Sequence, residues 1–98
     1  MQSNPDRYTM HAYVCGRDCV VNSSHVGAMT FAQIFEERPN GCRYAVVETG
    51  GRFLVWDLYA VESMTQRRKM WLTPPPPVRE TEDVDSAIVA TAMLYDQE

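Results

Sequence analysis

The chain has 98 residues, of which 45% are hydrophobic and 22% are charged, and its formal net charge is −4. A chain of this length can enclose one hydrophobic core but not two, so we predict a single domain over residues 1–98 with a flexible N-terminus at residues 1–7. The composition excludes an intrinsically disordered chain, and the apolar runs are far shorter than the roughly 18 to 20 residues of a membrane-spanning helix. The first six residues are polar and lack the basic and apolar regions of a signal peptide. We therefore expect a cytoplasmic protein with no membrane attachment.

The acidic charge is concentrated near the C-terminus. Residues 79–98 carry six acidic side chains and one basic side chain, whereas residues 1–78 carry seven acidic and eight basic side chains. Nucleic-acid binding normally needs a basic face that displaces phosphate counterions, so direct binding of nucleic acid is not expected from the overall charge. A protein partner with a basic surface is electrostatically more favourable.

The N-terminal part of the chain has the pattern of a β-hairpin. Residues 8–14 alternate between two faces with a period of two, which indicates a half-buried strand. Residues 16–18 follow as a turn that contains a glycine, and residues 19–22 are predicted to return as the second strand.

A short helix is predicted to begin at Phe31. Thr30 and Gln33 have the spacing of a capping box, and Met29 and Ile34 are placed to pack against each other across the helix start. The Pro-Asn-Gly sequence at residues 39–41 ends the helical pattern after about two turns.

The clearest supersecondary signal is a second hairpin. Residues 43–48 and 52–59 are rich in β-branched and aromatic residues, and they flank Gly50 and Gly51, which suit a tight turn that needs positive backbone angles. A two-residue loop would place Val47 opposite Leu54. We expect the face that carries this pair, with Trp56 and Leu58, to meet the helices.

The rest of the chain contains one ambiguous segment, a spacer and a helix. Residues 66–72 fit either an edge strand or a helical turn, and residues 73–78, with four consecutive prolines, predict an extended spacer. Apolar residues at helical spacing then predict a C-terminal helix over residues 81–96. The predicted fold is α+β, with a small antiparallel sheet of four to five strands and two helices in the order strand-strand-helix-strand-strand-(strand)-helix.

The three cysteines predict no disulfide, because their number is odd and no export signal precedes them. Cysteines and histidines are also the ligands that zinc prefers, but only the first pair has a spacing close to that of a structural zinc site. Small structural thiols are therefore the favoured interpretation over a metal site. The candidate ligands for such a site are Cys15, Cys19, Cys42, His11 and His25.

No catalytic or cofactor motif is found, so we expect neither an enzyme nor a cofactor. The glycine pair joins two strands instead of opening a helix, so it matches no phosphate-binding loop. Asp57 is predicted to lie in a strand opposite Tyr44 and to serve as a surface or hydrogen-bonded residue. A thiol-dependent enzyme with Cys19 or Cys42 as nucleophile remains an alternative, because a catalytic base need not be close in sequence.

Two charged segments are candidates for partner binding. Arg67, Arg68 and Lys69 precede Trp71, and such a group can neutralise phosphates and stack on a base, although a solvated edge segment is the simpler interpretation. The acidic residues near the C-terminus are either a favourable helix start or a docking surface for a basic partner. These acidic residues are Glu80, Glu82, Asp83 and Asp85.

By elimination, the sequence favours a non-enzymatic protein-binding module. We expect a small inhibitor or regulator that occupies a basic surface of a larger nucleic-acid-handling complex, for example an anti-defence protein of a phage or mobile element. The main alternative is a small accessory or structural subunit that acts by oligomerisation, with a homodimer as its simplest form.

Overall fold

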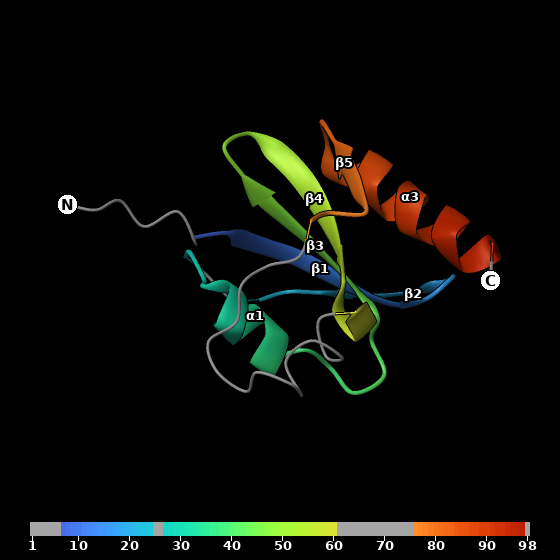
Figure 1. Cartoon of the computed structure of the whole chain (residues 1–98), viewed down its shortest axis with the longest axis horizontal. Helices are drawn as coiled ribbons and strands as arrows, with labels where there is room; N and C mark the ends of the chain where they lie inside the picture. The colour runs from blue at the N-terminus through green and yellow to red at the C-terminus, as the bar shows by residue number, and fades with distance from the viewer. Residues whose placement is uncertain (1–6, 25–26, 61–75, 98) are drawn as a thin grey trace.

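The computed structural model describes residues 7–24, 27–60 and 76–97. Five strands form one antiparallel sheet in the order β2-β1-β3-β4-β5, and helices α1 and α3 lie on opposite sides of it (Figure 1). This arrangement confirms the predicted α+β class. The elements are β1 (Thr9–Gly16), β2 (Cys19–Asn22), α1 (Phe31–Glu36), β3 (Tyr44–Thr49), β4 (Arg52–Asp57), β5 (Arg79–Thr81) and α3 (Val84–Asp96).

Both predicted hairpins are present. The β1–β2 pair turns at residues 17–18, and its register shifts between Val14 and Gly16. The β3–β4 pair has the predicted register, with Val47 opposite Leu54 and Tyr44 opposite Asp57. Gly50 and Gly51 both have positive φ angles, so the two-residue turn inferred from their sequence is confirmed.

The start of α1 is also as predicted. The Thr30 side chain accepts a hydrogen bond from the Gln33 backbone N–H, and the Gln33 side chain accepts one from the Thr30 N–H. Met29 and Ile34 are fully buried in the same apolar cluster. These local contacts fix where the helix begins, since they satisfy backbone donors that the first turn leaves unpaired.

The fifth strand differs from the sequence prediction. The segment predicted as an optional strand, residues 66–72, lies outside the described residues, and β5 instead follows the proline-rich spacer. It pairs with β4, and the backbone N–H of Val78 donates to the Val55 carbonyl at 2.8 Å. Three residues are too few to show a period in the sequence, so this strand is specified by the open edge of β4. Helix α3 therefore begins at Val84, three residues later than predicted, with Asp83 as its N-cap.

The expectation that one face of the sheet would meet both helices was wrong. The face with Val47 and Trp56 packs against α1, where the Trp56 ring makes edge-to-face contacts with Tyr8 and Phe31 at centroid distances of 4.8 and 4.7 Å. The opposite face, which includes Val46, packs against α3. The alternation of β3 could not reveal this, because its first four residues are all buried.

The prediction of three free thiols was also wrong. Cys15 at the end of β1 and Cys42 before β3 form a disulfide, and Cys19 remains a free, exposed cysteine. An odd number of cysteines requires only that one be unpaired. The chain brings Cys15 and Cys42 together because β1 and β3 are neighbours in the sheet, although 27 positions separate the two residues.

Candidate protein-binding surface

The acidic residues predicted to bind a partner gather where β5 leads into α3. We call Glu80, Glu82, Asp83 and Asp85 the acidic surface. Glu80 lies in β5, Glu82 in the short connection, Asp83 at the N-cap of α3 and Asp85 in its first turn. Helix α3 packs against the sheet and so holds the start of the helix in place. All four acidic residues are exposed.

Two of these carboxylates are engaged within the domain. The Oε2 atom of Glu80 lies 2.6 Å from Nε of Arg52. The side chain of Asp83 accepts a hydrogen bond from the Ser86 backbone N–H at 2.8 Å, and this bond is the main reason that the pKa of Asp83 is lowered. Asp83 therefore serves first as the helix cap.

The other two carboxylates are available to a partner. Within residues 7–24, 27–60 and 76–97, no cation forms an ion pair with Glu82 or Asp85. Glu82 also borders a shallow hollow of about 310 Å³ that is lined by Arg52, Glu80 and Thr81. A basic side chain that entered this hollow would meet the Glu82 carboxylate, and it would compete with Arg52 for Glu80.

Helix α3 adds an apolar feature that the sequence reasoning missed. Val89 and Met93 project from its outer side and are 57% and 56% exposed, more than any other large hydrophobic residue that the structure describes. We call these two residues the outer ridge of α3. They lie one helical turn apart and in line with Asp85, because i and i+4 positions share a face. The outer ridge therefore continues directly from the acidic surface.

The signal for this ridge is present in the sequence, since residues 86–95 contain no charged side chain. A helix with solvent on one side normally carries charged residues on that side. Here the buried side of α3 includes Ala87 and Thr91, and its outer side carries the apolar Val89 and Met93 one turn apart. Val89 and Met93 therefore form an exposed apolar patch on a helix that is otherwise held against the sheet.

Arg67, Arg68, Lys69 and Trp71 lie outside the described residues, as does His25. The structure therefore brings together the acidic half of the predicted partner-binding set only.

The residues considered for metal or thiol chemistry are dispersed. Cys15 and Cys42 are bonded to each other, and Nε2 of His11 lies 3.0 Å from Oε1 of Glu48. Cys19 lies at the turn end of the β1–β2 hairpin, whereas His11 lies beside Ser23 at the other end, about 13 Å away by strand geometry. In the part of the chain that the structure describes, no three His, Cys, Asp or Glu side chains are grouped to hold a metal ion.

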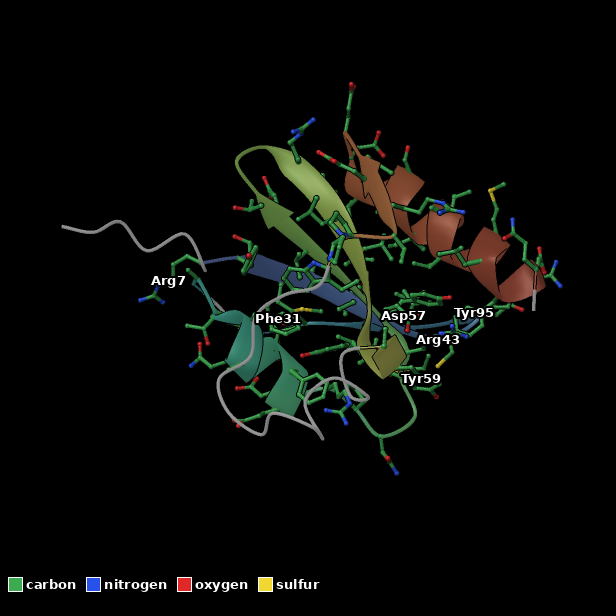
Figure 2. The ribbon with its side chains drawn as sticks, viewed as in Figure 1. Arg7, Phe31, Arg43, Asp57, Tyr59 and Tyr95 are labelled. Atoms are coloured by element: carbon green, nitrogen blue, oxygen red, sulfur yellow. A yellow bond between two sulfur atoms is a disulfide. The ribbon has the colours of Figure 1, made fainter. Side chains whose placement is uncertain are left out.

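Asp57 has a structural role. Figure 2 shows it beside Arg43 and Tyr59 at the end of β4. Its two carboxylate oxygens accept hydrogen bonds from Nε and Nη2 of Arg43 at 3.2 and 3.0 Å, and Oδ1 also accepts one from the Tyr59 backbone N–H. The Arg43 guanidinium lies 5.3 Å from the Tyr59 ring centroid. A carboxylate with these partners holds the strand end together and is not positioned as a general base.

Comparison with protein-family models, curated proteins and solved structures found no match. Among the described residues, no helix has the length and apolar character needed to cross a bilayer.

Proposed function

We propose that this domain is a non-enzymatic protein-binding module that docks through the acidic surface and the outer ridge of α3 onto a basic surface of a larger complex. The observation that carries the proposal is the continuity of unpaired acidic charge with exposed apolar side chains. Val89 and Met93 lie on the same helix face as Asp85, one and two turns further along. Interfaces commonly combine an apolar anchor with a charged rim in this way.

The two parts of the surface have different energetic roles. Burial of Val89 and Met93 removes exposed apolar area from water, so it contributes affinity and slows dissociation. Glu82 and Asp85 attract a basic partner over a longer range, so they raise the association rate and select against acidic partners. We infer that the partner offers an apolar groove with lysine or arginine at one end, where the start of α3 would lie.

The charges on α3 favour a basic protein over a second α3 as its binding partner. The helix carries Asp85 near one end and Asp96 at the other, and it contains no basic residue. A parallel pair of α3 helices would place the two Asp85 carboxylates side by side, which is repulsive. An antiparallel pair would place each Asp85 near the other copy's Asp96, which already forms an ion pair with Arg17 at 3.1 Å and offers no attraction to Asp85. A basic groove is complementary to Asp85.

A nucleic-acid-handling complex is a natural source of such a partner, because its binding grooves are basic. A protein that occupied such a groove would inhibit the complex by blocking nucleic-acid binding, as an anti-defence protein of a phage or mobile element would. The thiol-enzyme alternative has less support, since the Cys42 sulfur is bonded to Cys15 and His11 is remote from Cys19.

The test is affinity capture from an extract of the native cell with three tagged proteins. The first is the parent, the second carries Glu82→Lys and Asp85→Lys, and the third carries Glu36→Lys and Glu37→Lys. The third is a matched control, because it makes the same change in net charge at exposed residues of the α1 region, across the sheet.

We expect the parent and the control to retain one partner that elutes at raised salt, and the Glu82→Lys, Asp85→Lys protein to lose it. Val89→Ser with Met93→Ser should also lose the partner, through faster dissociation. Retention of the partner by both surface variants, or equal loss in the control, would contradict the proposed surface. Circular dichroism of each variant establishes that α3 is still folded.

A further inference from the structure

The two edges of the sheet differ in a way that bears on self-association. Strands β2 and β5 are the edges of the five-stranded sheet. At one edge β5 has only three residues, presents Arg79 and Glu80, and lies beside α3, so it resists pairing with another strand. At the other edge β2 is also short, but it has no charged residue, no proline and, among the described elements, no helix beside it, and all four of its residues are exposed. An edge without such protection is a template for an added strand.

The backbone of β2 has hydrogen-bonding groups that point away from the sheet. The Ser23 N–H donates to the His11 carbonyl, and Val21 lies opposite Tyr13 in the same register. Because backbone groups alternate along an antiparallel strand, Val21 faces β1 and the N–H and C=O groups of Val20 and Asn22 face outward. No strand among the described residues pairs with this outer side.

A hollow beside β2 leaves room for side chains of an added strand. It has a volume of about 280 Å³ and lies on the α1 side of the sheet. Val21 borders it, together with Tyr13, Glu37 and Pro39. A strand that paired with β2 would therefore meet both open backbone groups and an unfilled space next to an exposed valine.

We propose that a second copy of this chain occupies the β2 edge, in antiparallel pairing about a two-fold axis at Val21. In this register Val20 of each copy lies opposite Asn22 of the other, and each such pair exchanges two backbone hydrogen bonds. Val21 of one copy faces Val21 of the other as a non-hydrogen-bonded pair, in which side chains approach most closely. The two sheets then form one continuous sheet.

Three features favour a second copy as the occupant, and favour a dimer over a longer assembly. The pairing is self-complementary, because the same two residues supply the outward groups on both copies. The strand is neutral, so pairing of the two β2 strands brings no like charges together within the strands despite the net charge of −4, and Glu37 lies beside the hollow and not in the paired strand. The charged β5 edge blocks further addition, so the assembly closes at two copies. This inference is independent of the proposed function, and it leaves free the acidic surface of each copy, which lies beside β5 at the opposite edge of the sheet.

The test is sedimentation of the purified full chain over a concentration range up to about 1 mM, which covers weak association. We expect a reversible monomer–dimer equilibrium. Val21→Asp places two carboxylates face to face on the two-fold axis, and it should raise the dimer dissociation constant by at least about tenfold. Val21→Thr is the matched control, because it keeps a β-branched shape, and it should still dimerise.

A second variant addresses the backbone directly. Val20→Pro removes an outward N–H that the β1–β2 ladder does not use, so it should abolish the dimer while the circular dichroism spectrum stays that of the parent. Cys19→Ser should dimerise like the parent, which separates strand pairing from an intermolecular disulfide.

Four results would overturn the inference. They are a monomer at every concentration, a dimer that Val21→Asp leaves unchanged, a dimer lost in Cys19→Ser, and a dimer lost in Val89→Ser with Met93→Ser. The last result would place self-association on α3. Because no partner protein is needed, failure here is distinct from failure of the capture experiment.

Discussion

The turn between β3 and β4 can be tested by replacing both of its glycines with valine. Gly50 has a φ angle of 59° and Gly51 one of 81°, a region that L-residues with a side chain seldom adopt. A Cβ atom at either position would meet no other atom within 4 Å. The energetic effect of the substitution therefore arises from the backbone conformation and not from a steric clash.

The expected loss of stability follows from that geometry. A residue with a Cβ atom in the left-handed region costs about 1 to 2 kcal/mol, so the double variant should lose about 2 to 4 kcal/mol of unfolding free energy. For a domain of this size, each kcal/mol lowers the Tm by about 4 to 8 °C. The Tm should therefore fall by at least about 8 °C.

Urea unfolding followed by tryptophan fluorescence, with a thermal melt followed by circular dichroism, measures the change. Gly50→Asn is the control, because asparagine tolerates the left-handed region, and its effect should be within about 0.5 kcal/mol. If the double valine variant melts like the parent, the two-residue turn with positive angles is refuted. If the asparagine control is equally destabilised, the loss has another cause than backbone strain.

Three further predictions concern the disulfide, the α3 cap and the α1 contact. Alkylation of the unfolded chain without reductant should label only Cys19, and three labelled sites would show that the disulfide is absent. Loss of the Cys15–Cys42 bond should lower the unfolding free energy by about 3.5 kcal/mol, because the unfolded chain gains the entropy of the opened loop. Because the folded pKa of Asp83 lies below its unfolded value, its stabilisation of α3 is present at neutral pH and is lost as the pH falls through the folded pKa. In an acid titration followed by circular dichroism, Asp83→Asn should cap the helix without this dependence, and identical titrations would contradict the assigned cap. Tyr13→Phe removes the 2.6 Å hydrogen bond to a backbone carbonyl of α1 and should cost about 1 to 3 kcal/mol in urea unfolding, so an unchanged midpoint would count against that contact.

Part of the candidate surface was visible in the sequence. The four acidic residues were found from their clustering, but their local roles were not, because a cap and an ion pair depend on where the helix starts and on which strand lies alongside. Only after β5 is placed next to β4 does Glu80 meet Arg52, which leaves Glu82 and Asp85 as the available charges. The exposure of Val89 and Met93 likewise depends on which side of α3 the sheet covers.

The sequence by itself determined the features that arise from neighbouring residues. These features are the capping box before α1, the two hairpins and the register across Gly50 and Gly51. Each depends on contacts within a few positions or across one tight turn, so residue spacing is enough to predict its geometry. The alternation of each strand further limited which of its residues could share a face.

Only the tertiary structure decided how these units combine. The position of α3 on the opposite side of the sheet from α1, the pairing of β5 with β4, and the meeting of Cys15 with Cys42 all join segments that are distant in the chain. No local periodicity in the sequence predicts these contacts. They depend on which strand edge or apolar face is still open once the hairpins have formed. For the same reason the exposure of the uncharged β2 edge and of Val89 and Met93 on α3 is decided only in the folded domain, by which faces the rest of the described chain covers.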